Sequence, residues 1–572
     1  MLTIGTTREG SPIRLTDKER ARHIHVVGSI GTGKSKLLEY MIQQDIAVGR
    51  GLCLIDPHGT LVESLERWCA LRGMGILRRI HIIRPGGTDV VPGFNPLRTV
   101  PGQALSVRVD AMVAACAQAW GVADMSDTPR LEKILRSTFF ALSARGLTLA
   151  EGPALLRAAD PDGVRRNLTT DLPDPVFQIA WDELNSLSRK DFAEHVESTH
   201  TRLSKFLMAP AMRLMVGQRE HTLHFREAMD RGDIVLIDLG AREAFSYENA
   251  RVLGTLLIND LFLSALGRDE RISQRRPFTL YVDEAYDFLS GDIERILDQT
   301  RKFGLHAVLA HQRIGQLKKR GEGIYNAVMG GTQTKIVLGG LSDDDAGIMA
   351  REIMRGDIDL TTPKPGITMP VVVDEVPFWL ESESTSEGNA RSTSLSEGRA
   401  TGASSITSQG ESTSYMAPNG NWSQPNMLAM NMGSGAASNS SRSVVTTEGV
   451  STTFSRTYGR SQTLKSVREE RPTQFYTLEE SLHLAALNVR NLPDQTAIVK
   501  RRGMRTVVVD TVEVKPVLNV PKIVERFRHK TYRQSPYVSS PEAVSMELEG
   551  RRAQLFGPQT EPIRAEDFWT SE

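Results

Sequence analysis

The sequence has little that would indicate a secreted or metal-binding protein. Its 572 residues include only three cysteines, Cys53, Cys69 and Cys116, and none of them forms a CxxC pair. An odd and small number of scattered cysteines argues against a disulfide framework and against a zinc site, and it fits a reducing compartment. We therefore expect a cytoplasmic protein.

Long apolar runs are also missing. The most apolar stretch, Val252 to Leu266, is interrupted by Asn259 and Asp260, whereas a membrane-spanning helix needs about 20 predominantly apolar residues. This stretch is predicted to be a buried helix. The first residues contain no apolar signal-peptide region, so we expect neither secretion nor an integral membrane anchor.

Neither sign of charge is in excess. Lys and Arg total 69, and Asp and Glu total 69. With no net charge, the molecule as a whole would not be attracted to nucleic acid or to an anionic membrane. Any polyanion would have to bind through local contacts. The length exceeds that of one usual compact core, so more than one domain or a large insertion is expected.

What the sequence does contain is a complete phosphate-binding motif. Residues 28–35 fit GxxxxGK[ST] and lie between an apolar run at 23–27 and a helical pattern from about Lys36. In such a loop, glycines let the backbone amides face phosphates, the lysine reaches the β- and γ-phosphates, and the hydroxyl holds Mg²⁺. The predicted nucleoside triphosphate ligands are Gly28, Ser29, Ile30, Gly31, Thr32, Gly33, Lys34 and Ser35, with Ser35 also binding Mg²⁺.

Strand and helix patterns alternate around this loop. Over residues 1–100 they predict strands at 23–27, 52–55 and 80–83 with helices between them. From 101 to 226 strand signals vanish and helical spacing replaces them. The alternation returns over 227–379, with strands expected at 234–239, 278–283, 306–310 and 335–338. We predict an α/β fold whose mainly parallel sheet is built from two distant segments, interrupted by an all-α insertion.

The composition changes after this second α/β segment. Residues 380–465 are dominated by Ser, Thr, Gly and Asn, so we expect a low-complexity arm that is disordered or loosely β-paired. Residues 466–516 are expected to close the core. They should contain a helix near 479–486 and strands at 496–499 and 506–509. The basic stretch within 517–572 is expected to be a solvated tail.

Three of the predicted strands end in a carboxylate: Asp56, Asp238 and Asp283. Hydrolysis of a γ-phosphate needs a metal ligand and a base that activates water. Only Asp283 is followed directly by a second carboxylate, Glu284. We predict that Asp283 binds Mg²⁺ and that Glu284 is the catalytic base. If Asp56 were the metal ligand instead, the protein would resemble small-molecule kinases or switch GTPases.

Two further polar residues are candidates for catalysis. Gln312 directly follows the strand pattern that begins at His306, and ligands bind beyond the carboxyl ends of parallel strands. It is positioned to contact the γ-phosphate and report its loss. Arg301 lies on the flank of a helix predicted over 292–302. We predict that it acts across a subunit boundary as an arginine finger.

Together these motifs resemble the HerA/FtsK superfamily of hexameric RecA-like motors, and most closely the soluble relatives of TraD/TraG-type conjugative coupling ATPases. The resemblance covers the chain up to about residue 355 and again 476–514. The motifs that carry it are residues 25–35, 55–59, 94–97, 281–284, 301–304 and 310–312. It implies a RecA-like core with an all-α domain inserted near the DNA entrance of a ring, and ATP and Mg²⁺ as ligands. It also implies a hydrolytic site made of Lys34, Asp283, Glu284, Gln312 and Arg301.

The function implied by this resemblance is an ATP-driven DNA translocase. Such a motor would work as a homo-hexamer in the transfer or processing of mobile-element DNA, as in conjugation and type IV secretion, with relaxase or secretion-channel partners. Membrane-anchored coupling proteins have transmembrane helices before the motor, whereas this loop begins at Gly28, so no anchor is expected. Two alternatives stay open: a secretion- or defence-type ATPase that drives a protein partner such as a nuclease, and an ATP-gated scaffold that does not hydrolyse.

Overall fold

The computed structural model of the protein has two compact units. The first comprises residues 1–358 and 478–572, and the second comprises residues 359–477. The described residues are 1–87, 89–100, 102–122, 128–240, 244–268, 275–290, 293–354, 356–359, 361–366, 368–391 and 450–556.

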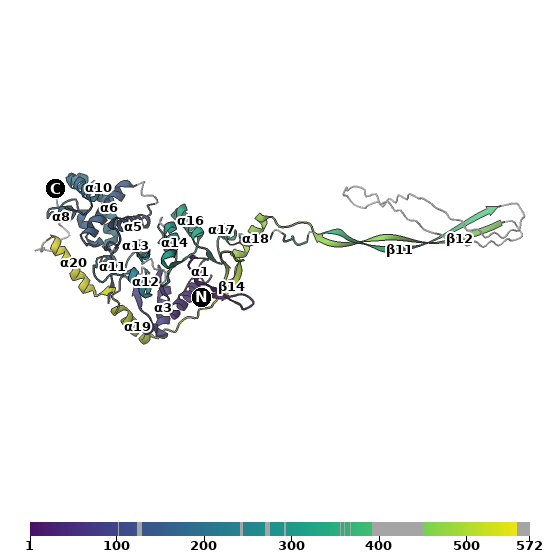
Figure 1. The fold of residues 1–572 in the computed structure, drawn as a ribbon, viewed down its shortest axis with the longest axis horizontal. Helices are drawn as coiled ribbons and strands as arrows, with labels where there is room; N and C mark the ends of the chain where they lie inside the picture. The colour runs from purple at the N-terminus through teal and green to yellow at the C-terminus, as the bar shows by residue number, and fades with distance from the viewer. Residues whose placement is uncertain are drawn as a thin grey trace. The chain divides into compact units, whose positions relative to one another are not determined.

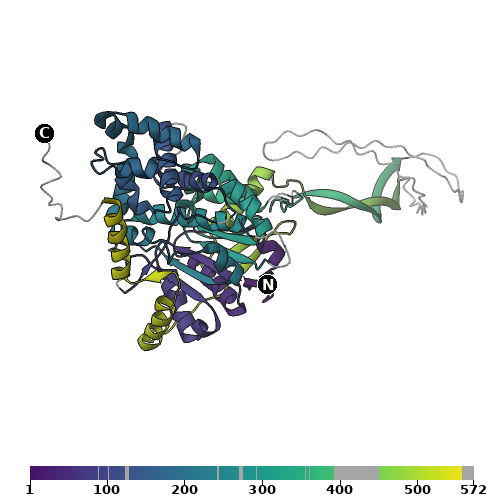
Figure 2. The same ribbon diagram turned by 60° about the vertical axis from the view of Figure 1, so that its left-hand side comes forward.

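An eleven-stranded sheet forms the centre of the first unit (Figures 1 and 2). Its order is β2-β1-β14-β13-β10-β3-β9-β8-β4-β7-β5. The strands are β1 Leu2–Thr6, β2 Pro12–Leu15, β3 Ile24–Val27, β4 Gly51–Asp56, β5 Ile80–Ile83, β7 Ile234–Asp238, β8 Phe278–Val282, β9 Leu305–His311, β10 Thr334–Leu338, β13 Thr496–Lys500 and β14 Val507–Thr511. All neighbours from β10 to β5 pair in parallel, while β13, β14, β1 and β2 add an antiparallel edge. The predicted mainly parallel α/β sheet is confirmed; β1 and β2 are not among the predicted strands.

Helices cover both faces of this sheet. Because successive strand residues point to opposite faces, Leu52 and Leu54 of β4 pack with α2 (Lys34–Val48), α3 (Thr60–Leu71) and α19 (Pro521–Arg533). Cys53 and Ile55 belong to the core on the other face, with α13 (Tyr247–Leu266) and α14 (Ile293–Thr300). The other helices of this unit outside the insertion are α1 Asp17–Arg20, α4 Met74–Leu77, α15 Ile314–Arg320, α16 Glu322–Gly331, α17 Asp343–Ile353, α18 Leu478–Arg490 and α20 Pro541–Phe556.

The predicted insertion is helical over its described residues. Its helices are α5 Leu105–Ala119, α6 Pro129–Ala144, α7 Gly152–Leu155, α8 Val164–Thr169, α9 Pro175–Ser186, α10 Arg189–Met208, α11 Pro210–Val216 and α12 Phe225–Arg231. In Figure 1 the blue helices of this group gather on the side of the sheet away from α3 and α19. Their apolar residues share one continuous core with α13 and with that face of the sheet, so the insertion is a layer of the first unit.

The predicted buried helix around the most apolar stretch is α13, whose residues are buried along most of its length. Its interior includes Asn259 and Asp260. Asp260 forms ion pairs with Arg98 and Arg108 of the same unit. Among the residues that the structure describes, no helix is both long and apolar enough to span a membrane.

The second unit contains the described ends of the expected low-complexity arm. β11 (Thr368–Arg391) and β12 (Val450–Pro472) form a long antiparallel pair, which we call the ribbon. Residues 380–391 and 450–465, for which disorder or loose pairing was expected, are regular strand. Residues 392–449 of the predicted arm lie outside the described residues. The expected boundaries at 380 and 466 both fall inside ribbon strands, and the core resumes with α18.

The prediction of a solvated C-terminal tail is wrong for its described part. α19 and α20 pack on the first unit, with Val524 and Phe527 of α19 buried in the core. Arg528 donates to the buried carboxylate of Glu66 at 2.6 Å. The few apolar residues of this polar segment lie on one helix face, which packs against the first unit. The prediction failed because the average composition does not show how apolar residues are arranged around a helix. Residues 557–572 lie outside the described part of the chain.

A buried polar network supports β8 from the far end of the sheet. The guanidinium of Arg20, which is 2% exposed, donates to both oxygens of Asp45 at 2.8 and 2.5 Å. Tyr281 of β8 donates to the same carboxylate at 2.7 Å. The network therefore ties α1 and α2 to the strand that leads to Asp283.

We expect Asp45→Ala to destabilise the first unit strongly. It leaves the Arg20 guanidinium buried without its carboxylate, and breaking such a pair costs about 3–5 kcal/mol. Urea denaturation followed by circular dichroism would measure this. Glu183→Ala is the control, because Glu183 pairs with Lys133 where the side chains are 61% and 52% exposed, and such pairs contribute about 0–1 kcal/mol. Equal losses in the two variants would contradict the role of the network.

Candidate functional site

The phosphate-binding loop connects β3 to the start of α2. Gly31 and Gly33 have positive φ angles of 87° and 101°, a backbone region that glycine enters without steric cost. A Cβ on Gly28 would lie 2.7 Å from the Cβ of Leu338. The loop thus wraps tightly between β3 and β10, as the glycine spacing requires.

Five of the predicted catalytic and metal-binding side chains meet at the carboxyl ends of three adjacent strands, β3, β9 and β8. Lys34 Nζ lies 2.6 Å from Glu284 Oε1 and 3.8 Å from Asp283 Oδ1, and Lys34 is only 6% exposed. Gln312 Nε2 donates to the same Glu284 oxygen at 2.7 Å. Ser35 Oγ donates to Asp283 Oδ2 at 3.4 Å. Residues that are about 250 positions apart in the sequence therefore share one buried site.

Glu284 is held in an unusual conformation at this site. Its φ angle is 47°, in the left-handed region, and its Oε2 atom is buried without a hydrogen-bond partner. Such backbone strain clusters at functional sites. Burial raises the pKa of the neighbouring Asp283; Lys34 opposes this shift, and the charges of Glu284 and Asp56 add to it. The acidic pair therefore faces the ammonium group of Lys34 and has unused acceptor capacity at Glu284 Oε2.

The other two strand-end carboxylates are already engaged by the protein. Asp56 accepts hydrogen bonds of 2.8, 2.9 and 3.0 Å from backbone amides at the start of α3. Asp238 accepts from Arg84 Nε at 2.6 Å and from the Gly240 amide at 2.9 Å. Both carboxylates stabilise local structure, which leaves Asp283 and Glu284 facing the loop.

The structure does not bring Arg301 to this site. Arg301 is exposed and begins a 3₁₀ turn (Arg301–Phe303) that precedes β9, whereas Gln312 follows the end of β9. A strand of seven residues spans roughly 20 Å. Arg301 therefore lies at the opposite edge of the sheet from the loop of its own chain.

The loop is also supported from the C-terminal segment, by a residue that is not among the predicted site residues. The Gln495 amide donates to the Thr32 carbonyl at 3.0 Å, and the Gln495 carbonyl accepts from the Thr511 amide at 2.7 Å. Gln495 has a positive φ of 59°. These contacts use backbone atoms, so no side-chain pattern could have indicated them.

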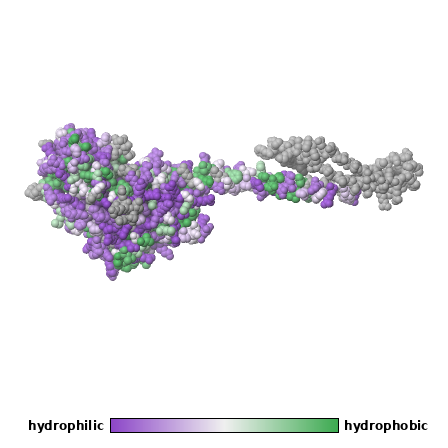
Figure 3. Space-filling view, in the orientation of Figure 1, coloured by the Kyte–Doolittle hydropathy of each residue, from purple (hydrophilic) through white to green (hydrophobic). Residues whose placement is uncertain are grey.

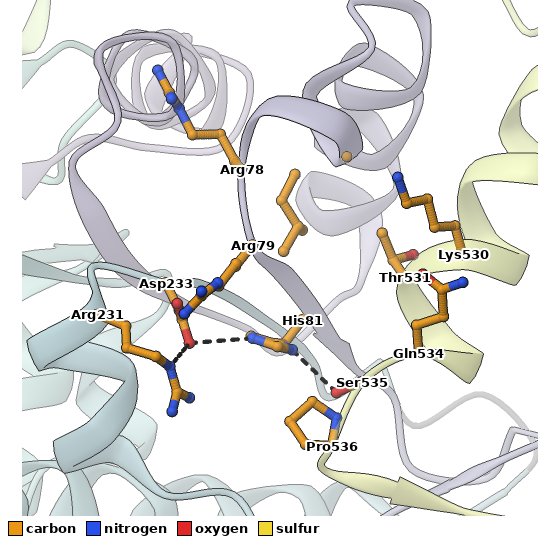
Figure 4. Close-up of a pocket in the computed structure, with 12 residues that line it drawn as sticks. Arg78, Arg79, His81, Arg231, Asp233, Lys530, Thr531, Gln534, Ser535 and Pro536 are labelled. Carbon is orange, nitrogen blue, oxygen red and sulfur yellow. Dashed lines mark hydrogen bonds and ion pairs between the residues drawn. The ribbon is translucent and has the colours of Figure 1, made fainter.

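A cavity of about 410 Å³ lies elsewhere, near the amino ends of β5 and β7. There His81 Nε2 lies 3.3 Å from Asp233 and His81 Nδ1 lies 3.1 Å from Ser535, while Arg231 donates to Asp233 at 2.9 Å (Figure 4). Burial raises the pKa of Asp233, but the hydrogen bonds from His81 and Arg231 outweigh it and hold that pKa below its usual value. These contacts fasten the segment after α19 to the sheet, at the edge opposite the phosphate-binding loop.

Comparison with solved structures finds matches over most of the chain. The bacterial conjugative coupling protein TrwBΔN70, in its trigonal form with sulphate, matches with a TM-score of 0.51 and 16% identity, covering 91% of this chain and 90% of that chain. Its unbound monoclinic form matches with a TM-score of 0.50 and 16% identity, covering 90% and 91%.

The chain has the fold of TrwB. TrwB in complex with the non-hydrolysable ATP analogue ADPNP matches with a TM-score of 0.50 and 15% identity, covering 90% of this chain and 91% of that chain. At these identities, the likeness to TrwB is a likeness of fold. No protein-family model and no curated protein matches the chain.

Two buried histidines lie beneath the loop. His25 of β3 and His311 of β9 are both 0% exposed, with their Nε2 atoms 2.5 Å apart. Burial, together with the ammonium groups of Lys34 and Lys335, lowers the pKa of His311 to about 3. Burial is also the main cause that lowers the pKa of His25. Both rings are therefore neutral near pH 7.

We expect the free energy of unfolding to fall as the pH decreases from 7.5 to 5.5. In the unfolded chain a histidine has a pKa near 6.5 and becomes protonated below that pH, whereas folded His311 stays neutral. The stability that His311 contributes is therefore fully present above pH 6.5 and is lost progressively as the pH falls below it. The slope is at most about 1.4 kcal/mol per pH unit for each such histidine. Urea denaturation across this range should show a shallower slope for His311→Asn than for exposed His529→Asn. Identical slopes would show that His311 does not contribute.

Proposed function

We propose that the protein is an ATP-hydrolysing motor of the conjugative coupling type, which moves DNA as a ring in the transfer or processing of a mobile element. The main support for this proposal is the ion pair between Lys34 and Glu284, whose Nζ and Oε1 atoms lie 2.6 Å apart. It places the lysine of a phosphate-binding loop beside a carboxylate suited to activating water. Such convergence favours hydrolysis over nucleotide binding alone.

In the proposed reaction, ATP competes with Glu284 for Lys34. The β- and γ-phosphates would accept from Lys34 and from the loop amides, because they carry more charge than one carboxylate. Glu284, released from Lys34, would take the proton of the attacking water. Gln312 donates to the same Glu284 oxygen, so its position would depend on whether that oxygen is still bound to Lys34.

The residues present fit a magnesium ion. The Ser35 hydroxyl and the Asp283 carboxylate are hard oxygen ligands of the kind that Mg²⁺ prefers, and they already lie within 3.4 Å of each other. These two residues would hold the ion. Bound there with the nucleotide, Mg²⁺ supplies positive charge against the phosphate oxygens.

The fold neighbour supports the choice of nucleotide and cargo. TrwB is a plasmid coupling protein and has been solved with an ATP analogue and with a GTP analogue. A shared fold together with a complete phosphate-binding loop favours a purine nucleoside triphosphate as substrate, for which we propose ATP, and DNA as cargo here. A relaxase or a secretion-channel component would then be the expected protein partner.

The position of Arg301 supports assembly into a ring. It lies roughly 20 Å from Gln312 along β9, so it is remote from the phosphates bound by its own chain. We infer that Arg301 serves the site of a neighbouring copy in a homo-hexamer. A closed ring of identical head-to-tail interfaces gives every site one such arginine.

ATP turnover should be stimulated by DNA and should require the acidic pair. Glu284→Gln should lower kcat by about 10²–10⁴-fold, the range for loss of a general base, and Lys34→Ala should abolish turnover. Release of phosphate with and without single- and double-stranded DNA would measure both effects. Glu294→Gln, at an exposed position of α14, is the control. If DNA does not change the rate of turnover at any salt concentration, a protein cargo is favoured. If Glu284→Gln keeps normal turnover, Glu284 is not the catalytic base.

Complementation tests the inferred role of Arg301. Arg301→Ala should lower turnover by about 10³–10⁵-fold, whereas the neighbouring exposed Lys302→Ala should not. Mixing inactive Lys34→Ala with inactive Arg301→Ala in equal amounts should restore about a quarter of the normal activity, because about a quarter of random interfaces combine two intact residues. If the mixture stays inactive after subunit exchange, Arg301 does not act in trans.

A further inference from the structure

The short helix α4 leaves two large apolar side chains exposed. Ile76 is 80% exposed and Leu77 is 62% exposed. A Cβ on Gly75 would lie 2.9 Å from a ring carbon of Phe527, so the Gly75 side of α4 is pressed against α19 and the next two residues face solvent. In Figure 3, green atoms gather at the lower end of the first unit, where Figure 1 shows α19 and α3. Apolar side chains that gather on the surface in this way indicate an interaction site.

The cavity near the amino ends of β5 and β7 lies directly beside this apolar pair, since Gly75 and Arg78 both line it. Its lining includes one carboxylate and four cations: Asp233, Arg78, Arg79, Arg231 and Lys530. The carboxylate is already paired with Arg231 at 2.9 Å, and Arg78 donates to backbone carbonyls at the end of α2. Arg79 and Lys530 are exposed and, within the described chain, form no ion pair. They lie on opposite sides of the cavity in Figure 4, so two cations are available to one anionic group.

The helix that forms the other wall of the cavity adds further positive charge. α19 contains five basic residues and one acidic residue: Lys522, Arg526, Arg528, Lys530, Arg533 and Glu525. Of the basic residues, Arg528 is held by Glu66. A molecule with no net charge thus concentrates cations beside an exposed apolar pair, which is the local contact that binding of a polyanion requires.

Nucleic acids and membranes both present phosphates, but the apolar pair distinguishes them. Single-stranded nucleic acid is held by cations together with aromatic side chains on which its bases stack, whereas Ile76 and Leu77 are aliphatic. An anionic bilayer presents phosphate groups directly above acyl chains, so it can use the cations and the apolar side chains at once. Stable peripheral binding generally needs two such signals. The combination therefore favours a lipid surface.

We propose that residues 74–79 and 522–533, which we call the α4–α19 surface, dock on an anionic phospholipid bilayer. Arg79 and Lys530 bind the phosphate of a lipid headgroup at the cavity, and Ile76 and Leu77 enter the boundary of the acyl chains. The cavity of about 410 Å³ is within the size range of small-molecule sites, so a headgroup has room there. Because the α4–α19 surface lies at the edge of the sheet opposite the phosphate-binding loop, docking leaves that loop free and does not depend on the proposed ATPase function.

Co-sedimentation of the full chain with vesicles tests the role of the cations. The chain should bind vesicles of phosphatidylglycerol and phosphatidylcholine, and it should not bind vesicles of phosphatidylcholine alone. The double variant Arg79→Gln and Lys530→Gln should bind the mixed vesicles about 30-fold more weakly, because each cation near an anionic surface adds to the attraction. Arg189→Gln with Lys190→Gln, at exposed positions of α10 in the helical insertion, changes the charge equally and should bind normally.

A second pair of variants tests the apolar contact. Ile76→Ser with Leu77→Ser should weaken binding to the mixed vesicles about tenfold, because the side chains that enter the acyl boundary are lost. The matched control is Val176→Ser with Ile179→Ser on α9, where the native side chains are 70% and 59% exposed. Circular dichroism would confirm that all four double variants are folded.

A fluorescent label locates the contact. All three native cysteines are buried, so Ile76→Cys supplies one exposed thiol for a dye whose emission depends on its surroundings. With the mixed vesicles, emission of this dye should move to shorter wavelength, as expected for entry into an apolar layer. The same dye at Ile179→Cys should not respond.

Other outcomes overturn the proposal. If the unchanged chain does not bind the mixed vesicles at low salt, or binds phosphatidylcholine vesicles equally well, the α4–α19 surface does not recognise anionic lipid. If the control variants lose as much binding as the variants of this surface, the attraction is not located there. If Arg79→Gln with Lys530→Gln weakens retention of DNA and leaves vesicle binding unchanged, the cavity binds nucleic acid instead.

ATP turnover separates this proposal from the proposed function. Without vesicles, turnover should be the same in all these variants as in the unchanged chain. A chain that binds the mixed vesicles as described but does not hydrolyse ATP would refute the proposed function and leave the docking surface in place. A chain that hydrolyses ATP but binds neither kind of vesicle would do the reverse.

Discussion

The buried ammonium of Lys34 is the constraint from which the architecture of the first unit follows. An isolated buried cation is costly, so it must lie against anions, and here these belong to Asp283 and Glu284. Contact across such a sequence distance requires the chain to return beside its own starting strand, and here it does so after forming the helical layer of α5 to α12. The order β3-β9-β8 at the centre of the sheet meets this requirement with two parallel neighbours.

Much of this could be predicted because local patterns carry it. The alternation of apolar strands with helices predicted β3 to β5 and β7 to β10, and the carboxyl ends of parallel strands necessarily lie at one edge. The residues Lys34, Ser35, Asp283, Glu284 and Gln312 could therefore be expected to meet, and the structure brings them together. Their catalytic roles remain proposals, because contact alone does not assign them.

The parts that could not be predicted depend on partners remote in sequence. β1 joins the sheet through its pairing with β14, which is remote in sequence, and Gln495 acts through backbone atoms that every residue has. At the ends of the expected arm the described residues are paired strands; because Ser- and Thr-rich strands without a core resemble disorder in composition, the sequence left disorder and loose β-pairing both open. Arg301 differs from these cases, because its motif could be recognised in the sequence. A single chain cannot show whether Arg301 reaches the site of a neighbouring copy.

The pairing of β1 with β14 also sets the order in which the molecule is completed during synthesis. Gly5 of β1 pairs with Thr511, and the phosphate-binding loop rests on Gln495, so both stay unfinished until nearly all of the chain has left the ribosome. At about 5–20 residues per second, the roughly 460 residues between the phosphate-binding loop and Gln495 take tens of seconds to synthesise, so the loop lacks its backbone support for that long.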